Sequence, residues 1–451
     1  MNKTRVRPGP LLCVFLALCL SCNERSSSTV NTPPESSDTF DQANDDMGPT
    51  GLGQQTSQKS REQSPNVDPP DQKKFNQANT DFSFALFQQL RTRRGNLFYC
   101  PHSISVALAM TYAGAASTTA SQIETAMHFE LTEKKLHKAF NWLARELDKR
   151  NKLAPGQQGK GFVLRTANAL WGQTGSPFER AFLDTLAVNY GSGMHLLDFA
   201  ANSEGSRSII NAWVEKQTED KIEDLVPPRA ITPDTRLVLT NAVYFLAPWE
   251  NPFKKNKTTT GPFHFSDRTT VDVPMMRQTE HLAYAETATC QAVEMPYNGR
   301  QLSMVLLLPK EGSLKTFEAD LTGETFREVL DQLKSTRVQL TVPRFEFESS
   351  LELNRELKAM GMVDAFNPNA ADFKKMSSLN DLFISAVHHK GYIKVDEKGT
   401  EAAAATAVVA IRTSVPRPPT IMTLNRAFLF VIVDKPTSAV LFVGRVINPS
   451  P

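Results

Sequence analysis

Residues 397–419, with the sequence EKGTEAAAATAVVAIRTSVPRPP, most constrain what this chain can fold into. A Gly and a Thr lie near the start, small side chains and two valines follow, and one arginine precedes a proline-rich end. The run is apolar enough for a buried strand, yet it ends with the composition of an exposed loop. A segment with both characters indicates a mechanism based on refolding of the chain, in contrast to catalytic turnover.

As a strand, this segment would direct alternate residues to one face of a sheet. Glu401 falls on the opposite face and stays in water, whereas a slip of one residue would bury its charge. Gly399 supplies a flexible hinge at the start. An Ala-rich helix that packs and never moves is the alternative interpretation. Counted from Thr400, the buried face contains only small or β-branched residues without charge: Thr400, Ala402, Ala404, Thr406, Val408 and Ala410.

The chain has 451 residues, of which 40% are hydrophobic, and a formal net charge of +2. This length supports one large domain or two smaller ones, and the near-neutral charge gives no reason to expect a nucleic-acid partner. Beyond the N-terminal region, the only cysteines are Cys100 and Cys290, which fit neither a disulfide framework nor a zinc spacing. We expect two separate buried thiols, with one long-range disulfide as the alternative.

Residues 1–22 have the pattern of a signal peptide. A basic start precedes an apolar stretch at 11–20 that is too short for an ordinary membrane span. Ser21 followed by Cys22 resembles a bacterial lipoprotein signal, in which Cys22 would carry the lipid; simple secretion after cleavage near Ser21 is the alternative. We therefore expect a secreted, extracellular protein or a cell-envelope lipoprotein tethered to a membrane through Cys22.

Residues 23–74 are rich in polar residues and proline and poor in apolar ones, which predicts a disordered linker. From Phe75 the pattern changes, and residues 75–451 are expected to form the folded domain. Helical spacings occur early, whereas apolar strand runs such as 237–245 and a closing hairpin at 428–446 come later. This order predicts an α+β fold with large mixed or antiparallel sheets.

Catalytic motifs are missing from the sequence. It contains no GxSxG, HExxH or GxxxxGK[ST] pattern. His388 and His389 are adjacent and would point to opposite faces of a strand, which is poor geometry for a shared metal ion. We expect no catalytic residue, no metal site and no cofactor.

Four segments resemble the landmark segments of the serpin family, in the family's order and at roughly its spacing. The resemblance covers about 75–449 and implies the serpin fold, with three β-sheets, eight or nine helices and an exposed reactive-centre loop. The segments are NLFYCPHSISVALAMTYAGA (96–115), LTNAVYFLAPWENPF (239–253), VDEKGTEAAAATAVV (395–409) and FLFVIVDKPTSAVLFVGRVINP (428–449).

The resemblance implies an inhibitor that acts as a suicide substrate. A serine protease, trypsin-like or elastase-like, would cleave the loop, which would then insert into the central sheet. A cysteine protease is an alternative target, and a non-inhibitory serpin that acts as a binding module or chaperone is the alternative function. We expect a monomer. The implied loop hinge consists of Glu397, Gly399, Thr400, Glu401, Ala402, Ala403, Ala404 and Ala405.

The scissile bond has two candidate positions. Counting along the loop from Glu397, as in long-loop inhibitory serpins, places it between Thr413 and Ser414. Cleavage one residue earlier, at Arg412–Thr413, would offer an arginine to a trypsin-like protease, whereas Thr413 suits a small elastase-like pocket. Arg412 is the strongest specificity element of the loop and favours Arg412–Thr413, but the sequence leaves both bonds open.

Further positions match the family's gate for insertion. Ser103, Asn241 and His389 match residues that hydrogen-bond beneath the central sheet in serpins, and Trp249 matches a tryptophan at the point of loop entry. Ordinary core packing is their alternative role. Ser103 is also expected to cap a helix. Cys100 stands where a small hydroxyl residue is commonest, and this predicts a looser or more apolar gate because a thiol is a weak hydrogen-bond partner.

Overall fold

The computed structural model places the folded part of the chain in one unit. Contacts divide the chain into Met1–Asp41 and Gln42–Pro451, and every residue described below belongs to the second unit. The structure describes residues 53–152, 162–265, 269–379, 381–400 and 418–450.

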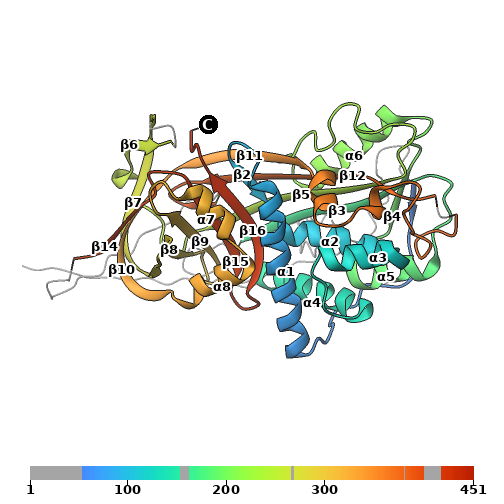
Figure 1. Cartoon of the computed structure of the whole chain (residues 1–451), viewed down its shortest axis with the longest axis horizontal. Coiled ribbons are helices and arrows are strands. Elements are labelled where there is room, and N and C mark those ends of the chain that lie inside the picture. The colour runs from blue at the N-terminus through green and yellow to red at the C-terminus, as the bar shows by residue number, and fades with distance from the viewer. Residues whose placement is uncertain (1–52, 153–161, 266–268, 380, 401–417, 451) are drawn as a thin grey trace, which may run out of the picture. The chain divides into compact units, whose positions relative to one another are not determined.

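The elements follow the expected order, with helices concentrated early and strands late (Figure 1). The described residues contain the helices α1 (Pro69–Leu90), α2 (Pro101–Tyr112), α3 (Ser117–Ala126), α4 (Glu133–Lys152), α5 (Arg180–Tyr190), α6 (Ser203–Gln217), α7 (Leu314–Asp320), α8 (Gly323–Asp331) and α9 (Asn354–Ala359). Their strands are β1 (Gly53–Gln55), β2 (Leu97–Tyr99), β3 (Val163–Gln173), β4 (Met194–Leu197), β5 (Leu237–Pro248), β6 (Thr259–His264), β7 (Thr270–Glu286), β8 (Cys290–Pro296), β9 (Leu302–Pro309), β10 (Lys334–Pro343), β11 (Phe345–Glu352), β12 (Ile384–Val395), β13 (Gly399–Thr400), β14 (Thr420–Thr423), β15 (Phe428–Asp434) and β16 (Ala439–Val446).

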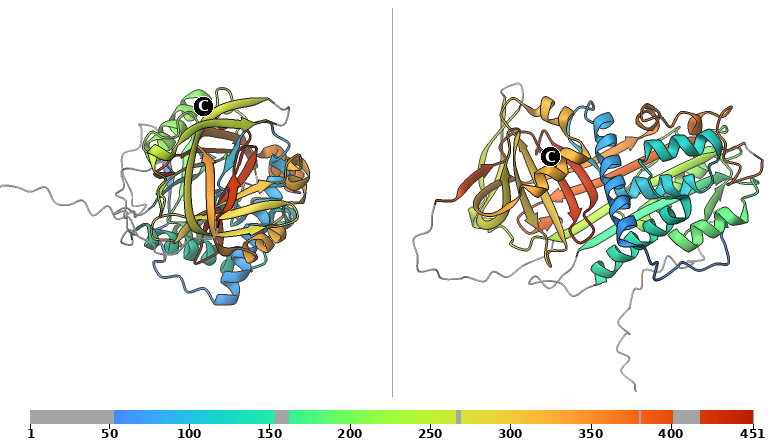
Figure 2. Two further views of the ribbon diagram at one scale, coloured as in Figure 1. Left: turned by 90° about the vertical axis from the view of Figure 1, so that its left-hand side faces the viewer. Right: turned by 60° about the horizontal axis from the view of Figure 1, so that its bottom comes forward.

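A seven-stranded sheet, in the order β1-β4-β3-β5-β13-β12-β11, forms the centre of the fold. Strands β5 and β12 pair in parallel over most of their length, and both are largely buried. Ile210 and Val214 of α6 pack on one face against Ala167, Val238 and Ala242, whereas α2 contacts β3 and β5. The right-hand view of Figure 2 shows the early helices in front of these strands.

The second sheet joins nine strands in the order β14-β10-β7-β8-β9-β15-β16-β2, with β6 added to β7. The serpin resemblance implies three sheets, whereas the described strands form two hydrogen-bonded sheets. The two numbers of sheets differ because one long strand joins two groups of strands into a single sheet. Strand β7 has 17 residues, and it pairs with β6 and β10 along most of its length but with β8 at its end, which links two groups of strands.

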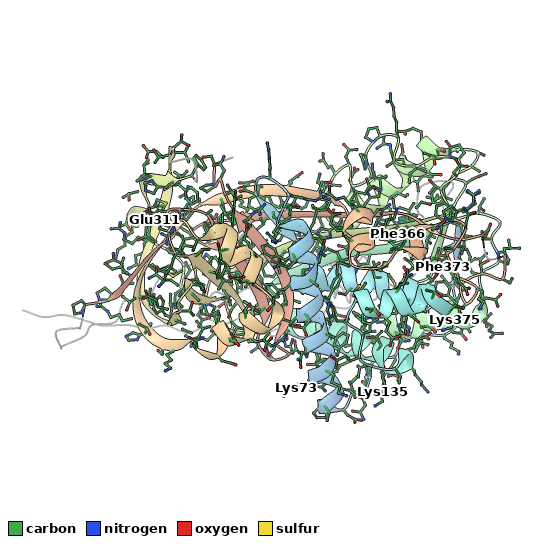
Figure 3. All side chains as sticks on the ribbon, in the orientation of Figure 1. Lys73, Lys135, Glu311, Phe366, Phe373 and Lys375 are labelled. Carbon is green, nitrogen blue, oxygen red and sulfur yellow. The ribbon has the colours of Figure 1, made fainter. Side chains whose placement is uncertain are left out.

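The linker predicted at 23–74 is wrong for its last part. Strand β1 pairs antiparallel with β4 at the edge of the central sheet, and α1 begins at Pro69. Proline at the first helical turn favours this start, since it needs no hydrogen-bond donor there. Figure 3 labels Lys73 near the start of α1 and Lys135 near the start of α4, and the Lys135 ammonium is 2.8 Å from the Asp71 carboxylate.

Side-chain contacts also hold the segment between β1 and α1. Ser57 donates a 2.5 Å hydrogen bond to Asp184 of α5, and Arg61 donates one of 2.9 Å to Asn141 of α4. Val67 is buried in the main core. The low apolar content of this segment indicated disorder. However, the segment needs little hydrophobic surface of its own, because it adds a strand to the sheet edge and forms hydrogen bonds with side chains of α4 and α5.

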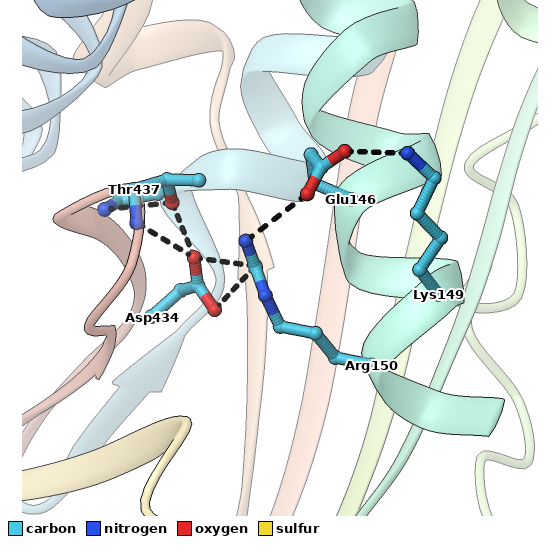
Figure 4. Close-up of polar contacts among 6 residues, drawn as sticks. Glu146, Lys149, Arg150, Asp434 and Thr437 are labelled. Atoms are coloured by element: carbon cyan, nitrogen blue, oxygen red, sulfur yellow. Dashed lines mark hydrogen bonds and ion pairs between the residues drawn. The ribbon is translucent and has the colours of Figure 1, made fainter. Parts of the chain in front are cut away.

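A buried ion pair anchors the end of α4 to the β15–β16 hairpin (Figure 4). One Arg150 nitrogen lies 2.6 and 2.7 Å from the two Asp434 oxygens, and the Thr437 hydroxyl donates to the same carboxylate. Burial raises the pKa of Asp434 even though Thr437 and Arg150 favour its charged form. Removing either partner would leave an uncompensated buried charge, which makes this contact a strong constraint on the position of α4.

Cys100 and Cys290 are buried free thiols, which confirms the expectation of two separate cysteines. No helix within the described part of the chain is both long and apolar enough to span a membrane.

Candidate functional site

The site lies where β5 and β12 separate. The two strands are direct neighbours as far as the pair Tyr244 and Tyr392. Beyond this pair, β13 fits between them: Thr400 pairs with Ala247 of β5 and with Val395 of β12. The central sheet is therefore closed along most of the β5–β12 seam and already open at one end, where the first residues of the hinge occupy the gap.

Thr400 is fully buried, and its hydroxyl lies 2.8 Å from the Tyr297 hydroxyl. In the sheet as it stands, Thr400 therefore already occupies a buried position. Gly399 has φ +155°, and a Cβ at this residue would lie 2.2 Å from the Ala247 carbonyl oxygen. The hinge therefore needs glycine because the backbone of β5 comes too close for any side chain. Glu401, the run from Ala402 to Ala405, and the reactive-bond candidates lie outside the described residues, as does Cys22.

Trp249 lies directly after β5, beside the turn that leads into β13. Its ring stacks on Tyr297 with 4.5 Å between ring centroids, and its indole Nε1 donates a 3.0 Å hydrogen bond to the Asp396 carbonyl. Its backbone N–H donates to the Lys398 carbonyl at 2.8 Å. Trp249 therefore holds the turn that leads into β13.

Glu397 is buried at this turn, and an ion pair and hydrogen bonds hold its carboxylate in place. Arg344 donates two hydrogen bonds to its carboxylate, at 2.9 and 2.5 Å, and Thr258 donates a third at 2.5 Å. Burial opposes ionisation of Glu397, but the hydrogen bonds from Arg344 and Thr258 outweigh it and lower its pKa. Arg344 lies directly before β11, so the ion pair fixes the position of the turn between β12 and β13.

The predicted gate residues meet beneath the closed part of the seam. Asn241 of β5 is the register partner of His389 on β12, and their side chains hydrogen-bond. Asn241 also donates to the Ser103 hydroxyl at 2.5 Å. The backbone N–H of Cys100 donates to His389 Nε2 at 3.2 Å, so Nδ1 carries the ring proton and donates to Asn241. The network therefore connects both strands of the seam to the start of α2.

Sequence reasoning missed Asn168, which completes this network from β3. Its side-chain oxygen accepts from Ser103 at 2.7 Å and from Asn241, its register partner across the β3–β5 pair. The available signal was an amide within a strand whose neighbours are mostly apolar. A buried amide needs partners, and its pairing register identifies them.

The expected helix cap was misplaced. Cys100, not Ser103, is the N-cap of α2, and its sulfur accepts a 3.4 Å hydrogen bond from the Ser103 backbone N–H. Ser103 is already inside the helix, where its hydroxyl is free to enter the gate network. Burial raises the pKa of the Cys100 thiol to about 12, so it is a neutral group.

His388 and His389 are both buried, and a metal site does not form around them. No group of three or more His, Cys, Asp or Glu side chains within the described ranges is arranged to hold a metal ion.

The chain belongs to the serpin family. The family model described as serpin (serine protease inhibitor) matches residues 77–449. Over 383 residues the chain is 39% identical to leukocyte elastase inhibitor A of Rattus norvegicus, covering 82% of this chain and 98% of that relative. It is also 39% identical over 396 residues to human serpin B4, covering 83% and 99% of the two chains. Among solved structures, the thermophilic serpin tengpin in its native state has a TM-score of 0.78 at 29% identity, covering 88% of this chain and all of tengpin. Serpins are protease inhibitors and not catalysts, so the protein is not an enzyme.

Replacing Glu397 with Gln will lower the thermal unfolding midpoint. The change keeps the shape of the side chain but removes the charge that compensates Arg344. Since Arg344 is partly exposed, we expect the free energy of unfolding to fall by only about 1–3 kcal/mol. Glu346→Gln is the matched control, because Glu346 pairs with Lys394 at an exposed position and should cost less than about 1 kcal/mol. Equal midpoints for the two variants would contradict a structural role for the hinge ion pair.

The protein will lose stability below about pH 6.5. Burial lowers the pKa of His389 to about 3 and the pKa of each of His102, His137, His195 and His388 to about 4, against 6.5 for a free histidine. As pH falls from 6.5 towards 4, the unfolded chain binds protons that the native protein does not bind, so unfolding becomes more favourable. Urea unfolding midpoints at a series of pH values should fall over this range. A constant midpoint from pH 7.5 to 5 would contradict the burial of neutral histidines.

Proposed function

We propose that this serpin inhibits serine proteases as a suicide substrate. The protease acylates at the reactive loop, the cleaved loop inserts between β5 and β12 from Thr400 onwards, and the displaced protease cannot complete deacylation. The observation that carries the proposal is the gap at the end of the β5–β12 seam, with Thr400 already buried in it. A strand that continued in this register would extend into the seam without any change at the hinge.

Three features of the described residues support insertion over a fixed loop. The glycine at 399 permits close contact with β5, and the buried face at Thr400 accepts a small side chain. The seam below is closed by parallel pairing and by one polar network around Asn241. An inserted strand would replace the parallel pairing with antiparallel pairing to both strands, the orientation that β13 already has. The relatives named as elastase inhibitors support a serine protease as the partner.

The target class and the scissile bond are parts of the same proposal. Arg412–Thr413 suits a trypsin-like protease, and Thr413–Ser414 suits an elastase-like one. A cysteine protease is an alternative target.

We further propose that residues 1–22 direct export, with Cys22 as a lipid anchor or with free secretion as the alternative. We also propose that the protein acts as a monomer.

Mixing the protein with equimolar trypsin or elastase tests the mechanism. We expect a complex that survives boiling in SDS, together with a released C-terminal peptide whose first residue is Thr413 or Ser414. Protease with its catalytic serine changed to alanine is the control and should form no such complex. If every protease cleaves the loop and stays fully active, the protein is a substrate, and the alternative of a non-inhibitory binding module or chaperone replaces the proposal.

A further inference from the structure

A groove of about 520 Å³ lies between the α1–β2 turn and strand β11. Four consecutive residues of β11, from Glu348 to Leu351, border it. Neighbouring residues of a strand point to opposite faces, so a groove that touches four in a row follows the edge of the strand. Strand β11 is the last strand of the central sheet and pairs only with β12 among the described strands, so this edge has no strand partner.

Three arginines line this groove, and two of them form ion pairs with a single carboxylate. Arg93 and Arg355 both bond to the same oxygen of Glu356, at 2.9 and 2.8 Å. Arg94 is exposed and has no side-chain partner within the part of the chain that the structure describes. The acidic residue on the lining, Glu348, is paired with Lys390 at 2.9 Å. The groove therefore has an excess of positive charge and a free guanidinium group.

The rest of the lining is mostly polar. Ser349 is 7% exposed, and its hydroxyl has no hydrogen-bond partner among the described residues. This hydroxyl is not enclosed, so water can satisfy it in the free protein and an anion in the groove can accept its hydrogen bond in place of water. Leu97 and Leu351 border the groove but are only 1% and 4% exposed, so polar side chains such as Thr92, Asn96 and Ser350 supply most of its accessible surface.

We propose that this groove binds a small phosphate or sulfate ester. Guanidinium groups match the tetrahedral oxygens of these anions, with which they form paired, charge-assisted hydrogen bonds. Arg94 and Arg355 would hold the anion, and Ser349 would donate to it. The groove has many times the volume of one water molecule, about 30 Å³, so it also accommodates the organic part of an ester beside the polar side chains of Thr92, Asn96 and Ser350.

Isothermal titration of the full-length protein at low ionic strength tests this site. The probes are glucose 6-phosphate, glucose 6-sulfate, inorganic phosphate, inorganic sulfate and glucose. We expect one ester molecule per chain, weaker binding of the inorganic anions and no binding of glucose, and the two esters distinguish phosphate from sulfate recognition. If neither ester binds, or if the inorganic anions bind as tightly as the esters, the proposal is wrong.

The double variant Arg94→Ala, Arg355→Ala assigns the binding to the groove. Both side chains are exposed, so the fold should be unaffected, and ester affinity should fall at least about tenfold. Arg277→Ala is the matched control, because Arg277 is an exposed arginine on β7 without a described partner, and it should bind as wild type. Unchanged affinity in the double variant with an unchanged unfolding midpoint would overturn the proposal.

Discussion

Replacing Thr400 with Arg will turn the protein from an inhibitor into a substrate of the same protease. Thr400 is fully buried between β5 and β12, beside the Tyr297 hydroxyl. A guanidinium at this point costs several kcal/mol to bury without a counter-charge. The two-residue β13 of the intact protein can leave the gap and avoid this cost, whereas a loop inserted from residue 400 onwards cannot. Each 1.4 kcal/mol slows a step about tenfold, so insertion should become slower than deacylation, and the protease should escape. The number of inhibitor molecules consumed per protease inactivated should rise by more than about tenfold.

Two control variants separate insertion from other effects of this change. Thr400→Ser retains a small side chain and the hydroxyl contact with Tyr297, and it should inhibit as wild type. Thr260→Arg adds the same charge at an exposed position on β6 and should also inhibit normally. If Thr400→Arg inhibits with wild-type stoichiometry, insertion does not begin at Thr400, and the proposed register is wrong.

Cleavage of the reactive loop will make the protein markedly more resistant to heat. Inserting the loop as a strand between β5 and β12 adds about a dozen ladder hydrogen bonds, each with a net contribution of about 1 kcal/mol. For a domain of this size, a gain of about 10 kcal/mol corresponds to a rise of about 10–20 °C in the unfolding midpoint. Calorimetry of the intact and the cleaved protein measures the difference.

The same experiment distinguishes the two candidate functions. Cleaved Thr400→Arg should show a much smaller rise than the cleaved wild type, because its loop cannot insert beyond the first residues. An unchanged midpoint after complete cleavage of the wild type would contradict insertion and would favour a non-inhibitory binding module or chaperone. The comparison needs no knowledge of the physiological protease, since any protease that cuts the loop produces the cleaved form.

Patterns within single segments predicted much of the fold. The apolar run 237–245 lies within β5, and the closing hairpin at 428–446 is present as β15 and β16. Alternation of side chains placed Thr400 on the face that would be buried, and the backbone freedom of glycine marked Gly399 as the hinge. These features depend on residues close in sequence, so periodicity and residue size are sufficient to find them.

Contacts between distant segments were harder to predict. The segment 53–68 has an unremarkable polar composition, and its order depends on β4, α4 and α5. Asn168 belongs to the gate network because the pairing register of β3 and β5 places it opposite Asn241. Both cases depend on partners in elements that are far away in the sequence, which local patterns do not show. The cap of α2 is a local contact that was assigned to the wrong residue, since the Cys100 sulfur accepts from the Ser103 backbone N–H and the Ser103 hydroxyl bonds to Asn168.

The sequence by itself determined that this chain has a small-residue segment able to become a strand, a glycine hinge before it and no catalytic motif. Side-chain size and backbone freedom are properties of the residues themselves. Only the tertiary structure decided where that strand begins. The gap between β5 and β12, the ion pair of Glu397 with Arg344 and the contact of Thr400 with Tyr297 join segments far apart in the chain. Their positions follow from the packing of two sheets against each other, which no single segment encodes.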